Sequence, residues 1–142
     1  MKATDPLNSI SNLFIQICKL RRNKTNALLA DADIHAGQDI LLYYLGVADG
    51  QTVSSLVEKM NIQHSTIFNM IDRMEATGMI RKEKDSADKR TSRIYLTEQG
   101  TAALAKVVIV WRTMEAETIK GFDAGETELL RSLLQKVHKN LG

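Results

Sequence analysis

The apolar residues between positions 61 and 97 change their spacing partway along, from helical to strand-like. In the first stretch they recur every three or four residues and so fall on one face of a helix: Ile67, Met70, Ile71 and Met74. Gly78 follows, and glycine commonly closes a helix in the left-handed conformation. Two runs of strand-like character then flank a charged segment at 85–90. The pattern predicts a turn, a helix and a β-hairpin.

A second, shorter amphipathic helix is predicted just upstream. Thr52 can cap it, and its apolar positions are Val53, Leu56, Val57 and Met60. Asn61, which tolerates the left-handed region, can then turn the chain sharply into the next helix. Two short helices joined by a tight turn indicate a helix-turn-helix, and the charged hairpin behind them adds a wing.

Helical spacing also fills the rest of the chain. Asp5 followed by Pro6 predicts a helix start, with the helix running from residue 7 to about residue 30. A second helix is expected over about 37–47, with four apolar residues inward: Ile40, Leu41, Tyr44 and Leu45. Thr97 can cap a long helix, and Asp123 with Glu126 has the spacing of a capping box for the last one.

The predicted fold is mainly α with a small β-hairpin wing, or α+β by a strict count. We expect one domain over 1–142, with a winged helix-turn-helix lobe at 37–97 and dimerisation helices at 1–36 and 98–142. The apolar faces of these outer helices are wider than one winged lobe can cover. A second copy of the chain would bury them in a homodimer. An intrachain bundle packed on a monomeric winged lobe is the alternative.

Composition and charge narrow the functional classes. The chain has 142 residues, 44% of them hydrophobic, and a net charge of only +2. Basic character is local, because residues 81–93 hold six basic and three acidic side chains, and a DNA backbone responds to local potential. One cysteine excludes an internal disulfide and fits a reducing compartment. With no stretch of membrane-span length and no signal pattern, we expect a cytoplasmic protein that does not contact membranes.

The side chains opposite the apolar face of the 65–76 helix suit nucleic acid. They carry hydroxyl, amide and guanidinium groups, which pair with base edges and phosphates: Ser65, Thr66, Asn69 and Arg73. Catalytic triads, glycine-rich phosphate loops and carboxylate clusters are missing from the sequence, so we expect neither an enzyme nor a cofactor. The three histidines are too far apart in sequence to predict a metal site.

The order of elements resembles the MarR family (multiple antibiotic resistance regulators) over essentially the whole chain. The run 71–81 is similar to that family's recognition-helix exit, and 85–90 followed by 94–100 is similar to its wing signature. The resemblance implies a repressor that binds a near-palindromic DNA duplex as a homodimer. It places Arg90 in the minor groove and the polar helix face in the major groove. Lys89 and Arg93 complete the expected DNA contacts, and Asp72 is expected to brace the wing.

The chain departs from that family's pattern at three places. Gln63 stands where a hydroxyl cap is common, so Ser65 could cap the recognition helix instead and be lost to base reading. His35 replaces a common Thr or Ser before the second helix. Thr91-Ser92 replaces the glycine that often follows the basic pair of the wing.

Three alternatives remain open from the sequence. The resemblance implies a small aromatic or anionic effector, for which Arg21, Tyr44 and Trp111 are the candidate contacts, although such aromatics are more often core. Cys18 could make the chain a redox sensor, whereas a lone cysteine more often behaves as a small buried apolar residue. A winged helix can also bind protein in place of DNA, but such modules often lose the basic wing residues kept here.

Overall fold

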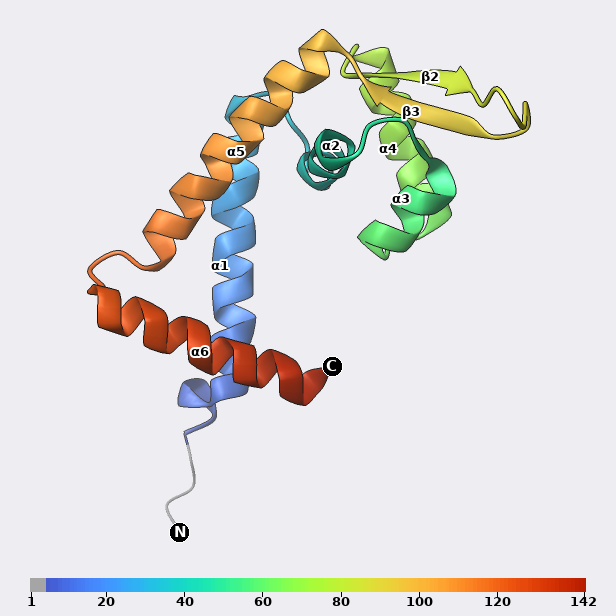
Figure 1. The fold of residues 1–142 in the computed structure, drawn as a ribbon. Coiled ribbons are helices and arrows are strands. Elements are labelled where there is room, and N and C mark those ends of the chain that lie inside the picture. The colour runs from blue at the N-terminus through green and yellow to red at the C-terminus, as the bar shows by residue number, and fades with distance from the viewer. Residues whose placement is uncertain (1–4) are drawn as a thin grey trace.

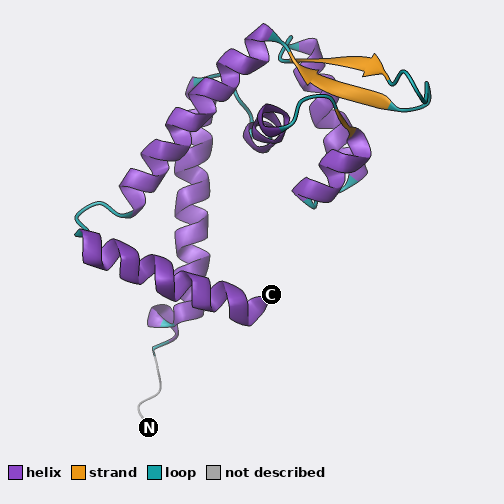
Figure 2. Cartoon of the chain, viewed as in Figure 1, coloured by secondary structure: helices purple, strands orange, loops and turns teal. Residues whose placement is uncertain are grey.

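The structure, a computed structural model, describes residues 5–142 and is mainly helical with a small antiparallel sheet (Figures 1 and 2). This agrees with the predicted fold class. In chain order its elements are η1 (Pro6–Asn8), α1 (Ile10–Asp31), α2 (Gln38–Val47), β1 (Gln51–Thr52), α3 (Val53–Met60), α4 (His64–Ala76), β2 (Ile80–Lys84), β3 (Ser92–Leu96), α5 (Glu98–Thr118) and α6 (Ala124–Leu141).

The predicted helix caps are present at three helix starts. Thr52 accepts a hydrogen bond from the Ser55 amide at 3.1 Å, and Thr97 accepts one from the Gly100 amide at 3.0 Å. Asp123 forms a reciprocal capping box at the start of α6. Each cap gives a partner to an amide that the helix itself leaves unpaired, which fixes where the helix begins.

The N-terminal helix begins later than predicted. Asp5 and Pro6 start only the short 3₁₀ turn η1, and α1 begins after Ser9. The Ser9 hydroxyl accepts from the Asn12 amide at 3.1 Å, so it offers a second cap that the prediction overlooked. The expectation of one helix starting at residue 7 was therefore wrong.

The hydrophobic core lies in the winged lobe, with α2 at its centre. Leu41, Leu42 and Leu45 are fully buried because α2 contacts α5, α3 and β3 on different sides. The predicted inward face of α2 was partly wrong, since Ile40 is exposed and Leu42 is buried. A helix with neighbours on several sides buries more than one stripe, and simple amphipathic spacing does not show which.

The wing is a three-stranded sheet in the order β1-β3-β2. Ile80 pairs with Leu96 and Lys84 with Ser92 along the hairpin, whose connecting loop projects away from the helices (Figure 1). β1 adds a third strand through Gln51 opposite Ile94. Its two residues were too few to give a strand pattern in the sequence.

α5 is joined to the base of the wing by a close backbone contact. The Thr97 amide donates to the Met79 carbonyl at 3.1 Å, and the Thr97 hydroxyl donates to the Gly78 carbonyl. A Cβ on Gly100 would lie 1.9 Å from the Met79 carbonyl oxygen. Only glycine lets α5 approach the wing this closely.

The outer helices leave much apolar surface uncovered. α6 crosses near α1, away from the winged lobe (Figure 1), and has no buried residue within the described chain. Large apolar side chains are exposed on both helices: Leu13, Ile17, Leu20, Leu129, Leu133 and Leu134. Across residues 5–142, no helix combines the length and apolar character needed to cross a membrane.

Replacing Gly100 by Ala should destabilise the protein. The added methyl group meets backbone, which cannot move aside as a side chain can, and overpacking of this kind costs about 1–3 kcal/mol in free energy of unfolding. Gly125→Ala in α6 is the control, because its Cβ would meet only the Asp123 carboxylate, at 3.3 Å. Urea unfolding curves of both variants test this, and equal midpoints for Gly100→Ala and the wild type would contradict it.

Candidate nucleic-acid interface

The outer face of α4 carries the polar side chains that the sequence placed there. Ile67, Ile71 and Met74 are buried on the inner face. The opposite face carries four exposed polar residues: Ser65, Thr66, Asn69 and Arg73. The helix therefore presents hydrogen-bonding groups on an otherwise well-anchored element.

The start of α4 has no side-chain cap in the part of the chain that is described. Gln63 is the capping residue by its backbone, but its side chain makes no capping hydrogen bond. Ser65 lies inside the first turn and does not replace it, so the expectation that Ser65 could be the cap was wrong. The Ser65 hydroxyl is thus exposed and available to a ligand.

Asp72 braces the wing, as expected. Its carboxylate accepts a hydrogen bond at 2.9 Å from the Lys82 ammonium on β2, and Glu75 lies 3.6 Å from the same ammonium. The hydrogen bond to Asp72, together with the charge of Glu75, raises the pKa of Lys82 above its ordinary value despite some desolvation. These contacts tie α4 to β2 across the outside of the lobe.

Arg93 is engaged within the wing. Its Nε donates to Asp85 at 2.7 Å and its Nη1 donates to the Gly50 carbonyl at 2.8 Å. The hydrogen bond from Arg93 holds the pKa of Asp85 below its ordinary value. These contacts give Arg93 a bracing role where the strands of the hairpin meet the wing loop, and its expected DNA contact stays a prediction.

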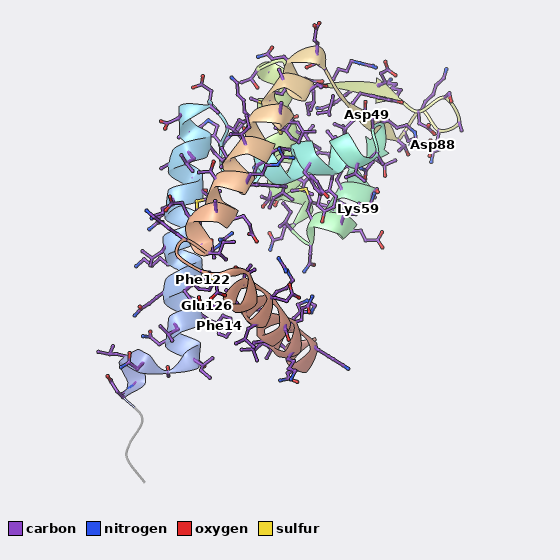
Figure 3. The ribbon with its side chains drawn as sticks, turned by 60° about the vertical axis from the view of Figure 1, so that its left-hand side comes forward. Phe14, Asp49, Lys59, Asp88, Phe122 and Glu126 are labelled. Atoms are coloured by element: carbon purple, nitrogen blue, oxygen red, sulfur yellow. The ribbon has the colours of Figure 1, made fainter. Side chains whose placement is uncertain are left out.

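The tip of the wing is shaped by carboxylates in place of a glycine. Asp88 lies at the tip (Figure 3), where its carboxylate accepts from the Arg90 amide at 3.0 Å. Asp85 accepts from the Asp88 amide at 3.1 Å. The turn is therefore closed by side-chain-to-backbone hydrogen bonds of the kind aspartate favours. Lys89 and Arg90 remain exposed beside it.

A polar notch beside α4 was missed by the sequence interpretation. It has a volume of about 250 Å³ and lies between the α1–α2 loop, the start of α2 and α4. Seven residues line it: His35, Ala36, Gln38, Thr66, Asn69, Met70 and Arg73. The unusual His35 was the only signal in the sequence, and spacing alone could not place it against α4.

The three candidate effector contacts do not meet in one cavity. Arg21 donates to Thr118 and lines an apolar pocket of about 470 Å³ between α1, α5 and α6. Phe14 and Phe122, on facing elements, line the same pocket (Figure 3). Trp111 and Tyr44 pack instead against the core, where Trp111 donates to Asp39 at 3.0 Å and Tyr44 to the Lys59 carbonyl at 3.3 Å.

Cys18 lies exposed on α1, contrary to the expectation that a lone cysteine is buried. Among the described residues no cluster of three or more His, Cys, Asp or Glu side chains could hold a metal ion. The exposed groups on the α4 face and the wing tip are hydrogen-bonding groups and cations.

Comparison with known proteins agrees with this geometry. A protein-family model described as the MarR family matches residues 37–92, which run from α2 through the wing. Residues 37–92 of the chain belong to the MarR family. The match confirms the resemblance found in the sequence, to a family of winged helix-turn-helix transcription regulators and not of enzymes.

Similar proteins carry regulatory names. The transcriptional regulator HosA of Escherichia coli O127:H6 is 32% identical over 83 residues, which are 58% of this chain and 62% of HosA. PecS of Dickeya dadantii, an HTH-type transcriptional regulator, is 33% identical over 88 residues, 62% of this chain and 53% of PecS. The chain thus matches less than two thirds of the length of either protein.

The fold similarity extends further along the chain. A mutant MarR from Escherichia coli, solved in complex with operator DNA, has a TM-score of 0.79 and 25% identity, covering 94% of this chain and 99% of that one. The helices outside the matched 37–92 region therefore also follow this fold.

The Asp85–Arg93 contact predicts how acid acts on the wing. Because the pKa of Asp85 is lower in the folded protein than its ordinary 3.8, its contribution to stability is present above that value. The contribution is lost as the pH falls through the lower, folded-state pKa. In Arg93→Gln the pKa of Asp85 should rise towards the ordinary value, which carboxyl NMR titration would show. An identical titration curve in both proteins would exclude this pairing.

Proposed function

We propose that the protein is a sequence-specific double-stranded DNA-binding transcription regulator that acts as a homodimer. The observation that carries the proposal is the exposed polar face of α4, on the same lobe as the exposed Lys89 and Arg90. The operator complex of the MarR mutant supports it. So does a MarR-family protein from Listeria monocytogenes solved with a 26mer DNA at a TM-score of 0.77 and 23% identity.

The two parts of the lobe would contact different features of the duplex. α4 fits a major groove, where side chains near the start of a recognition helix reach base edges. Ser65, Thr66 and Asn69 occupy that part of α4. Lys89 and Arg90 at the wing tip would lie against the adjacent minor groove and its phosphates.

We propose that a second copy of the chain buries the exposed apolar faces of the outer helices. Leu20 on α1 and Leu129 on α6 are 60% and 59% exposed, and several large exposed apolar side chains on long helices indicate an interaction surface. A two-fold dimer through residues 1–36 and 98–142 would bury them. It would also set two α4 helices about 34 Å apart, one turn of DNA, for a near-palindromic site.

Repression and effector release are the finer parts of the proposal. A dimer spanning a promoter would block access to it, which favours repression over activation. A small aromatic or anionic molecule could alter the spacing of the two α4 helices only by binding one arrangement better than the other. Because Arg21, Tyr44 and Trp111 do not share a cavity in the single chain, this release mechanism stays a prediction.

The competing function is a winged helix that binds protein without DNA. Such a module has no need for exposed cations at the wing tip. An affinity for duplex DNA that falls steeply as the salt concentration rises would favour the DNA-binding function, because phosphate contacts release counterions. Redox sensing through Cys18 would require DNA affinity to change on oxidation and to be insensitive to oxidant in Cys18→Ser.

Arg90→Ala should weaken binding to duplexes of every sequence. The slope of log affinity against log salt should also become shallower, by about the amount that one phosphate contact contributes. Arg131→Ala is the matched control, since this exposed arginine lies on α6 and pairs with Glu128. Fluorescence anisotropy at several salt concentrations measures both. Equal slopes for the wild type and Arg90→Ala would remove the wing from the interface.

Leu133→Glu combined with Leu134→Glu should convert a dimer into a monomer. Both leucines are exposed on α6, and charges placed there would be buried without partners in a dimer. Lys136→Glu, an exposed change on the same helix, should leave the dimer intact. Sedimentation velocity decides this, and a monomeric wild type at micromolar concentration would refute the dimer.

A further inference from the structure

The notch beside α4 is built from hydrogen-bond donors. His35 from the α1–α2 loop faces Thr66, Asn69 and Arg73 from α4 across it. No carboxylate lines the notch. A cavity with an imidazole, an amide, a hydroxyl and a guanidinium, and no acidic group, favours an anion over a cation or an apolar ligand.

The acidic residues near the notch are held elsewhere. Asp39 in the first turn of α2 accepts from the Gly37 amide at 3.1 Å and from the Trp111 indole at 3.0 Å. Asp72 on α4 is paired with Lys82 of the wing. Neither carboxylate lines the notch, so neither opposes an anion there at close range. Because Asp39 already takes the Gly37 amide, the site depends on side chains and not on the end of α2.

Gln38 lines the notch and carries a buried side-chain amide. Its side chain is only 4% exposed, and its Oε1 accepts from the His35 amide at 3.0 Å. Within residues 5–142 its Nε2 makes no hydrogen bond, although no fully buried side-chain nitrogen or oxygen there lacks a partner. The Nε2 therefore keeps a small solvent-accessible area, and Gln38 is one of the residues that line the notch. Such a preoriented amide group indicates a ligand, since buried donors are normally paired.

We propose that this notch binds a phosphate of the DNA backbone, held by His35, Gln38 Nε2 and Arg73. The proposal rests on the proposed function, because the duplex brings the phosphate. The notch shares Thr66, Asn69 and Arg73 with the exposed face of α4. A duplex with α4 in its major groove must therefore carry one strand past the opening. Backbone contacts of this kind fix the register of a protein on DNA.

The same placement changes the role of Arg73. It lies in the last turn of α4, whereas base edges are reached mainly from the first turns of a recognition helix. Its guanidinium lines the notch with His35. Arg73 therefore contacts the backbone beside the bases that Asn69 faces. Loss of Arg73 lowers affinity for all sequences alike, in place of the relaxed sequence preference that base reading would give.

The test is a methylphosphonate scan of a duplex selected by the wild-type protein from a random library. Each backbone phosphate in one half-site is replaced in turn by a neutral methylphosphonate, and affinity is measured for the wild type, His35→Ala and Arg73→Ala. His138→Ala on α6 is the matched histidine control. His35→Lys places a cation at this position and His35→Glu an anion, and all His35 variants keep the backbone amide that donates to Gln38.

One position should reveal the contact. The wild type should lose about tenfold in affinity when that phosphate is neutralised, the size expected for a hydrogen bond to a charged group. His35→Ala should lose a similar factor on the native duplex and nothing further at that position. His35→Lys should bind within about threefold of the wild type, and His35→Glu should bind more weakly than His35→Ala. His138→Ala should match the wild type, and melting temperatures should be unchanged throughout.

Other outcomes overturn the proposal in distinguishable ways. If His35→Ala lowers the affinity by the same factor on every methylphosphonate duplex as on the native duplex, no position depends on His35. That result would exclude a backbone contact in the notch. If inorganic phosphate shifts the His35 ring NMR signals while no methylphosphonate position depends on His35, the notch takes a free anion and not DNA. If the wild type selects no duplex from the library, the proposed function itself fails. If the wild type binds and Arg90→Ala weakens binding while His35→Ala does not, only the notch is refuted.

Discussion

The arrangement of the lobe depends on the contact between α5 and the base of the wing. Gly100 lies against the Met79 carbonyl so closely that a side chain at this position would collide with backbone. The Thr97 amide donates to the same carbonyl. Because β2 begins at the next residue and α5 continues towards α6, this one approach sets the angle between the wing and the outer helices. The buried face of α4, supplemented by the exposed Asp72–Lys82 pair, joins α4 to the lobe, so α4, the wing and the long helix α5 are held together.

Much of this architecture was predictable because it depends on local chemistry. Thr52, Thr97 and Asp123 start helices through hydrogen bonds to residues three positions along, and such spacing is visible in a sequence. Features set by contacts distant in sequence were not predictable. Which leucines of α2 are buried follows from its three neighbours, and the two-residue β1 exists only because β3 pairs with it. The notch needs His35 to meet α4 across a loop, and no spacing rule brings those residues together.

Three aspartates of the lobe make internal contacts, which resolves an apparent conflict for a surface that is proposed to face phosphates. Asp72 holds the Lys82 ammonium, and Asp85 holds Arg93. Asp88 closes the hairpin tip through the Arg90 amide. Each carboxylate is thereby matched with a donor, while the exposed cations Lys89 and Arg90 keep their charge for solvent or a ligand. The modest net charge of the chain thus hides an uneven distribution: these carboxylates stabilise the lobe, while Lys89 and Arg90 face outward.

In the proposed homodimer, the uncovered leucines of α6 would link the stability of the chain to its abundance. A helix with no buried residue of its own has little reason to stay folded alone, because most helix stability in proteins comes from packing. When its apolar face is covered only by another copy, folding of that helix becomes a bimolecular event, and the melting temperature rises with protomer concentration. The number of molecules per cell would then set the fraction with an ordered outer layer. The expression level of the protein would then decide whether a target with two half-sites is occupied, even without an effector.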